Sequence, residues 1–185
     1  MQSTELKSLD DLVRHVGRYP EGAFLFVREG LGFATEQLHG PETSAHRQLH
    51  EYLSEHDLDW SDLAGQYYSG TLPEVLTLAI QEAGGWEKMN RHISGRELCW
   101  GLRDYALRRW GLLAREVLGQ WNIVRTSDFG RIVFGFIDFE LMQKQAGDSI
   151  EDFFDIFDFE QAFEGSYKTA LTRGDGNEAP PSSPS

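Results

Sequence analysis

Apolar residues recur at three- and four-residue spacing along most of this chain, which is the pattern of amphipathic helices. The spacing predicts one helix over residues 6–16 and a second over residues 21–38, separated by a break at residues 17–20. Pro20 stands at the end of that break, where the first turn of a helix tolerates proline. Between residues 42 and 70 the apolar positions are interleaved with polar ones, so the helical pattern is weaker there.

Two capping-box sequences mark further helix starts. Thr71–Glu74 and Ser94–Glu97 both place a hydroxyl three residues before a glutamate, and this spacing satisfies the free amides of a first helical turn. We expect the first of these helices to run to Ala83 and the second to end at Gly111, because glycine is favoured just past a helix.

The next two segments form a pair. Residues 112–121 predict a helix, and Thr126–Asp128 supplies a cap for another, so the two have the layout of a helix-turn-helix. The stretch Ile132–Ile137 is apolar without a clear period, so a strand is the alternative there. A small wing from Leu141 onward would make this half a winged helix. Ser149 and Asp152 resemble another helix start.

The sequence therefore predicts a mainly α fold, a multi-helical single domain over residues 1–173, with a helix-turn-helix or winged-helix arrangement as an option for the C-terminal half. Residues 174–185 are rich in glycine, proline and serine and lack large apolar side chains, so we expect a disordered tail.

Composition narrows the class of protein. The 185 residues carry a formal net charge of −13, which repels phosphate backbones and anionic membranes. The longest strongly apolar run is Ile132–Ile137, far short of the roughly 20 residues that span a bilayer, so we expect no membrane segment. The single cysteine, Cys99, lies among apolar helical residues and indicates a reducing compartment. We expect a cytoplasmic protein.

Charge is unevenly distributed along the second half. Residues 91–131 hold eight arginines and four acids, a balance of 8 − 4 = +4, whereas residues 138–164 hold nine acids and Lys144, a balance of 1 − 9 = −8. Such neighbours attract one another, so we expect the arginines to be held by carboxylates and phenyl rings from the last third.

Three of these arginines, Arg103, Arg108 and Arg109, lie among aromatic residues and are the candidate binding residues. Guanidinium groups next to aromatic rings can hold an anionic ligand. Acids stand close in sequence, however, and structural pairing with those carboxylates is the favoured interpretation.

The histidines raise the question of a metal. His46 and His50 stand one helical turn apart, a spacing that suits two zinc ligands. The second histidine of the zincin pattern is replaced by Ser54, and no further ligand set is fixed by spacing. We interpret both as solvated surface histidines and expect no metal and no cofactor. The chain also shows no catalytic signature.

A longer pattern resembles an uncharacterised family of conserved hypothetical proteins associated with planctomycetes and verrucomicrobia. The residues that carry the resemblance are Arg91–Leu98, Gly101–Arg103, Ala106–Leu107, Trp110–Gly111, Leu113–Ala114, Val117–Leu118, Trp121, Thr126, Asp128–Gly130, Ile132–Phe134, Asp148, Asp152–Phe153 and Phe157–Phe159. The resemblance implies a bacterial source. It brings no catalytic or binding residue with it.

Three hypotheses for function follow. The leading one is a non-catalytic cytoplasmic protein-interaction or adaptor protein, whose acidic exterior suits a basic partner. The second is an enzyme or small-ligand protein that holds an anion with Arg103, Arg108 and Arg109. The third is a degenerate helix-turn-helix that binds nucleic acid, which requires the helix after Ser127 to be exposed. The acidic residues of that helix and the few positive charges on it argue against this hypothesis.

Overall fold

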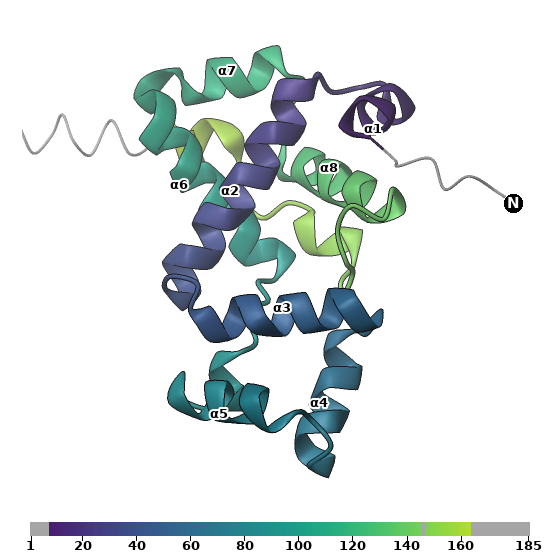
Figure 1. Ribbon diagram of the computed structural model, residues 1–185. Helices are drawn as coiled ribbons and strands as arrows, with labels where there is room; N and C mark the ends of the chain where they lie inside the picture. The colour runs from purple at the N-terminus through teal and green to yellow at the C-terminus, as the bar shows by residue number, and fades with distance from the viewer. Residues whose placement is uncertain (1–7, 146, 164–185) are drawn as a thin grey trace, which may run out of the picture. The chain divides into compact units, whose positions relative to one another are not determined.

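The computed structural model describes residues 8–145 and 147–163, and within these ranges the chain is helical and contains no strand (Figure 1). The mainly α prediction is confirmed. The strand alternative for Ile132–Ile137 is wrong, because this stretch belongs to a helix. The predicted tail, residues 174–185, lies outside the described residues.

The chain divides into two compact units. Unit 1 comes from both ends of the sequence, Met1–Ala34 and Ser94–Ser185, and unit 2 is the stretch between them, Thr35–Ile93. The first boundary falls inside one continuous helix, so residues 21–34 of that helix belong to unit 1 and residues 35–39 to unit 2. The prediction of one domain over residues 1–173 stays a prediction.

Each unit has its own set of helices. Unit 1 contains α1 (Leu9–Val16), most of α2 (Glu21–His39), α6 (Gly95–Trp110), the 3-10 turn η2 (Gly111–Leu113), α7 (Ala114–Gln120), α8 (Thr126–Asp138) and the 3-10 turn η3 (Ile150–Phe153). Unit 2 contains the end of α2, α3 (Ser44–His56), α4 (Trp60–Ser69), α5 (Glu74–Glu82) and the 3-10 turn η1 (Trp86–Lys88).

One of the two predicted capping boxes is present. Ser94 Oγ accepts from the Glu97 amide at 3.3 Å, and Glu97 Oε2 accepts from the Ser94 amide at 2.8 Å, so α6 begins as predicted. The capping box predicted at Thr71–Glu74 is absent. The Thr71 amide instead donates to the carbonyl of Gln66 at 2.9 Å and closes α4, and α5 begins after Pro73 with no side-chain cap.

Aromatic rings hold unit 1 together around Phe26 of α2. Its ring centroid lies 5.5 Å from Tyr105, 5.3 Å from Trp110, 6.0 Å from Trp121 and 6.4 Å from Phe129. These partners come from α6, the end of α7 and α8. Each such pair adds about 0.5–1.5 kcal/mol to the stabilisation from burial alone, so one side chain fixes α2 against three helices.

Rings from the last third dock on the same unit. Phe153 is buried against two glycines, and a Cβ at Gly95 or Gly130 would lie only 2.7 or 2.8 Å from its atoms. Phe157 packs on Trp100 at 4.7 Å. Phenylalanines of the last third thus pack on α6 and α8, but the rings that lie against Arg103, Arg108 and Arg109 are Trp100, Phe33, Tyr105 and Trp110, so the prediction that rings of the last third hold these three arginines is wrong.

The second helix of the predicted helix-turn-helix is mostly buried. Eight of the 13 residues of α8 are buried, including Phe129, Ile132 and Phe136. A helix that reads a nucleic-acid groove must present its side chains to solvent. The exposure that the nucleic-acid hypothesis requires is therefore absent from α8, and the helix-turn-helix detail is not confirmed.

The first helix of that pair begins later than predicted. The expected helix over residues 112–121 starts at Ala114, while Leu112 and Leu113 form the turn η2. Gly111 has φ +53°, a conformation that favours glycine, and it ends α6 before the turn η2 and α7 follow.

Unit 2 packs around its own apolar core. Its fully buried members are Leu49 of α3, Leu63 of α4, Ile80 of α5 and Met89 after η1. Each helix of this unit thus contributes one side of its surface, as the three- and four-residue spacing requires.

The close contact between α2 and α6 in unit 1 gives a test of the packing. A Cβ at Gly101 would lie 2.3 Å from the Cβ and 3.2 Å from the Cα of Ala34, which cannot rotate away. We expect Gly101→Ala to lower the free energy of unfolding by about 1–3 kcal/mol in urea denaturation.

Gly32→Ala on α2 is the matched control. A Cβ at Gly32 would meet nothing within 4 Å, so alanine should raise helix stability by about 0.5–1 kcal/mol. Equal effects of the two substitutions would contradict the close helix contact.

Candidate functional site

The three candidate arginines all lie on α6, and the structure gives each its own surroundings. Arg109 Nη1 donates to Glu29 Oε2 at 2.5 Å and to the Tyr105 hydroxyl at 3.0 Å, while Tyr105 donates to Glu29 at 2.8 Å. The hydrogen bond to Tyr105 is the main cause that raises the pKa of Arg109, and the Glu29 carboxylate raises it further. Arg109 is thus part of a closed set of three side chains.

The other two arginines rest on aromatic rings. Arg103 pairs with its neighbour Asp104 at 2.6 Å and lies 5.0 Å from the ring centroid of Trp100. Arg108 is exposed, with its guanidinium 5.6 Å from the ring centroid of Phe33. The predicted pairing with carboxylates of the last third is wrong for Arg103 and Arg109, because their partners come from α6 itself and from α2.

This arrangement weakens the hypothesis of an anionic-ligand site. Two of the three guanidiniums already have carboxylate partners in unit 1. A hollow of about 490 Å³ does occur on the same unit, lined by Arg115, Glu116, Gly119, Gln120, Ile123, Val124 and Phe159. None of the three candidate arginines lines this hollow.

The histidine prediction is wrong at His46. This side chain is buried, its Nδ1 accepts from the Thr43 amide at 3.1 Å, and its Nε2 lies 3.0 Å from the carbonyl oxygen of Lys88. Since a carbonyl only accepts, Nε2 carries the proton. His46 therefore joins the start of α3 to the last residue of η1 within unit 2. His50 is exposed, as expected. Within the described ranges, no three His, Cys, Asp or Glu side chains gather as metal ligands would.

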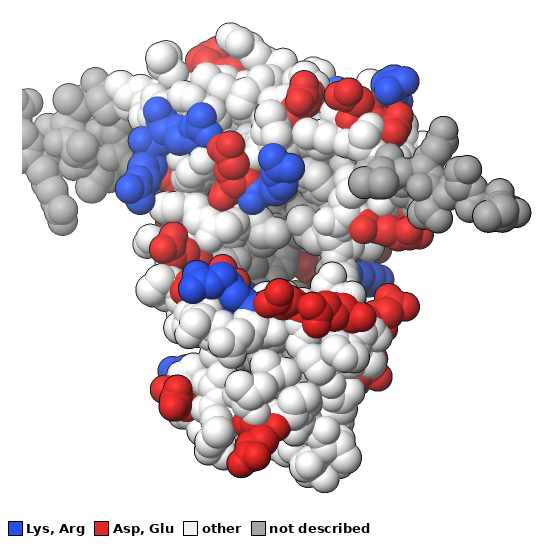
Figure 2. Space-filling view, viewed as in Figure 1, with Lys and Arg blue, Asp and Glu red and all other residues white. Residues whose placement is uncertain are grey.

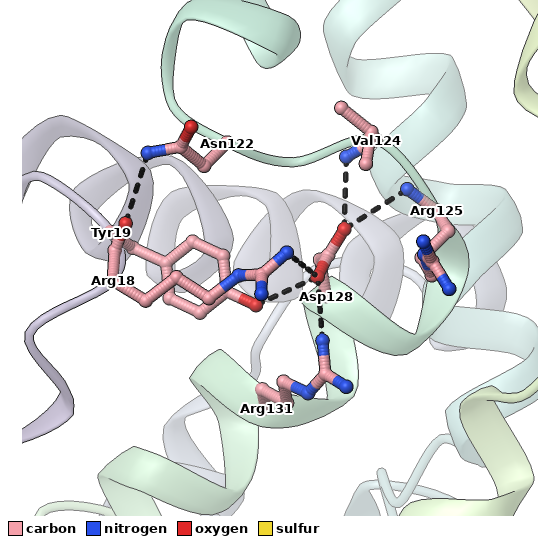
Figure 3. Close-up of polar contacts among 7 residues, drawn as sticks. All are labelled: Arg18, Tyr19, Asn122, Val124, Arg125, Asp128 and Arg131. Carbon is pink, nitrogen blue, oxygen red and sulfur yellow. Dashed lines mark hydrogen bonds and ion pairs between the residues drawn. The ribbon is translucent and has the colours of Figure 1, made fainter.

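Asp128 of unit 1 is a buried carboxylate with several polar partners (Figure 3). It is 0% exposed, and it accepts from the Tyr19 hydroxyl at 2.8 Å, the Val124 amide at 2.9 Å, the Arg125 amide at 3.1 Å and Arg131 Nη1 at 3.0 Å. Four donors compensate for the loss of water around the charge.

Asp128 ties sequence-distant segments together. Tyr19 stands 109 residues before it in the sequence. Burial is the main cause that raises the pKa of the Tyr19 phenol, and the hydrogen bond to Asp128 raises it further. Arg18 pairs with the same carboxylate at 3.5 Å, and Asn122 Nδ2 donates to the Arg18 carbonyl at 3.0 Å. The chain before α2 is thereby fixed to the turn between α7 and α8, which marks Asp128 as a structural residue.

A different surface has the character of a contact site. Leu112 and Leu113 are 62% and 63% exposed, although burial of such side chains is strongly favourable. Both sit in η2, between Arg108 and Arg109 of the last turn of α6 and Arg115 of the first turn of α7. We call these five residues the Leu112 corner.

The Leu112 corner is held from both sides. Before it, Trp110 packs on Phe26 at 5.3 Å and on Trp121 at 5.5 Å. After it, Ala114 is fully buried. The Gly111 amide donates to the carbonyl of Leu107 and completes the turn. The two leucines are therefore displayed by a rigid turn between anchored residues.

The corner is locally basic in an acidic protein. Residues 108–115 hold three arginines and no acid, a balance of 3 − 0 = +3, against −13 for the whole chain, although Glu29 of α2 pairs with Arg109 and Glu116 directly follows Arg115. Figure 2 shows basic side chains gathered where α6 gives way to α7. In the sequence, this surface is marked by Gly111, which ends a helix, followed by two adjacent leucines. The surface was not predicted because both leucines also fit the spacing of the next helix.

Comparisons of this chain with protein-family models, with curated proteins and with solved structures find no match. The resemblance described above therefore stays a prediction. In the described part of the chain, no helix combines the length and the apolar character that a membrane span requires.

Removing the charge of Asp128 tests its structural role. Asp128→Asn replaces an acceptor by a donor opposite buried donors, and we expect the free energy of unfolding to fall by about 3 kcal/mol. The matched control is Asp104→Asn, because Asp104 is exposed and its loss should cost no more than about 0.5 kcal/mol. Chemical denaturation compares the two variants, and similar losses would refute the assigned role.

The thiol of Cys99 gives a pH-dependent test. Burial raises its pKa from 9.0 to about 12, so the native thiol stays protonated and unreactive near neutral pH. A raised pKa stabilises the fold fully below pH 9.0, and this contribution is lost as pH rises toward about 12. We expect Ellman's reagent to label Cys99 only at the rate of unfolding, and the stability advantage over Cys99→Ala to shrink above pH 9.0. Fast labelling of the native protein would argue against the burial.

Proposed function

We propose that this chain is a non-catalytic protein-interaction protein and that the Leu112 corner is its contact surface. The observation that carries the proposal is the pair of adjacent leucines, each more than 60% exposed. Covering a leucine side chain contributes roughly 1.5–3 kcal/mol, so two such side chains together form an anchor of useful strength.

The rigidity of the corner favours this use. Binding is weakened when a loop must first become ordered. Here the turn is already fixed by Gly111, Trp110 and Ala114, so a partner does not have to order the backbone.

The chemistry around the leucines defines the partner. Arginine is enriched in protein interfaces because its planar group both stacks and forms paired hydrogen bonds. Arg108 has no carboxylate partner among the described residues; it is exposed and lies over the ring of Phe33. The surface therefore suits a partner that presents apolar side chains flanked by carboxylates.

A cytoplasmic setting fits the same proposal. Cys99 is the single cysteine of the sequence and is buried, so it has no second cysteine within the chain with which to form a disulfide. Proteins of this kind suit a reducing compartment.

Binding of model peptides tests the proposal. The probe is a fluorescent amphipathic helical peptide with leucines on one face and glutamates beside them, compared with a version in which lysines replace the glutamates. We expect the acidic peptide alone to bind, and Leu112→Asp with Leu113→Asp to weaken it at least about tenfold in fluorescence anisotropy.

Leu141→Asp is the control, because Leu141 is an exposed leucine of unit 1 outside the corner, and its replacement should leave binding unchanged. Arg108→Glu should also weaken binding. Equal binding of both peptides, or of all variants, would overturn the proposal, as would turnover of a substrate that the corner variants abolish.

A further inference from the structure

Unit 2 carries an exposed apolar surface of the opposite charge. On α5, Val75 and Leu78 are 67% and 52% exposed, while Leu76 and Ile80 are buried on the other side of the helix. Glu74 and Glu82 are exposed at the two ends of the same helix. Spacings of three and four residues place Glu74, Val75, Leu78 and Glu82 on one side, which we call the α5 face.

Acidic residues outnumber basic ones in the sequence around the α5 face, although the Lys88 side chain lies beside Gly84, just past the end of α5. No lysine or arginine occurs between Arg47 and Lys88, whereas this stretch contains eight Asp or Glu residues, a balance of 0 − 8 = −8. Figure 2 shows mostly uncharged surface with scattered acidic side chains over α4 and α5. The face therefore presents two apolar side chains framed by carboxylates.

The α5 face and the Leu112 corner have matching patterns. The corner presents two leucines between arginines, and the α5 face presents a valine and a leucine between glutamates. Apolar anchors of this size pack together once buried, and the flanking groups can form charged pairs at the rim. The chain itself thus carries the partner surface that the corner requires.

We propose that the Leu112 corner of one copy of this chain binds the α5 face of a second copy. The inference rests on the proposed function, since it names the partner of the same corner. Because two different surfaces meet, the contact is heterologous. In a pair formed this way, one copy keeps its α5 face free and the other keeps its Leu112 corner free. Association can then continue into rings or open chains rather than stop at a symmetric dimer.

The net charge of the chain makes this association selective. Two copies that each carry a net charge of −13 repel one another at long range, whatever their orientation. Contact between apolar side chains does not by itself favour one orientation over another. The basic corner against the acidic α5 face is an approach in which local attraction opposes that repulsion. The surfaces are small, so we expect weak, concentration-dependent association.

Sedimentation equilibrium on the full chain tests the inference with two single variants. Leu113→Asp removes the corner, and Leu78→Asp removes the α5 face. The wild-type average mass should rise with concentration beyond that of a dimer. Each variant alone should stay monomeric. An equimolar mixture should form a dimer and stop there, because one intact corner meets one intact α5 face. Leu141→Asp should behave as wild type, and circular dichroism checks that every variant is folded.

Each other result would overturn the inference. A wild-type protein that stays monomeric at every concentration would do so, as would a mixture of variants that remains monomeric. Loss of association in Leu113→Asp alone would indicate a symmetric contact between corners. If wild type is monomeric while the acidic peptide still binds the corner, the inference fails and the proposed function stands.

Discussion

The buried carboxylate of Asp128 is the interaction on which unit 1 depends. It brings the chain before α2 to the start of α8 through Tyr19, and it holds the turn after α7 through two backbone amides. A charge without water is tolerated only when donors replace the lost solvent, so these segments must take up their places together. Trp121, which ends α7, then reaches Phe26 and Trp110. The Leu112 corner is therefore rigid because a polar contact fixes the far end of α7 and an aromatic cluster fixes the end of α6.

Most helices could be predicted from the sequence because their determinants are local. Apolar spacing indicated α1, α2 and α6, and the box at Ser94 was found from two side chains three residues apart. The box at Thr71 failed although its letters fit, because the preceding helix uses the Thr71 amide to close its own last turn. The acid at Asp128 was expected to help start a helix, and it does accept from the Arg125 amide. Its bond to Tyr19 spans 109 residues, and no local pattern contains that information.

The candidate site was harder to predict, because exposure and pairing depend on how helices pack. Glu29 became the partner of Arg109 because α2 lies against α6, and counting nearby acids pointed to the last third of the chain. His46 appeared to be a surface residue, yet the start of α3 and the carbonyl of Lys88 enclose it. Leu112 and Leu113 fit a helical period and were predicted to begin a helix, whereas after Gly111, which has a positive φ, they form the turn η2 and remain exposed. Packing decides such positions, and a single sequence does not record it.

Methyl NMR of leucine- and valine-labelled full-length protein tests the central claim most directly, because it reports on the corner and the α5 face in one spectrum. As the protein concentration is raised, we expect the signals of Leu112, Leu113, Val75 and Leu78 to shift together, while that of Leu141 stays in place. Shifts confined to other residues, or an unchanged spectrum at every concentration, would contradict the claim that these two exposed surfaces recognise one another.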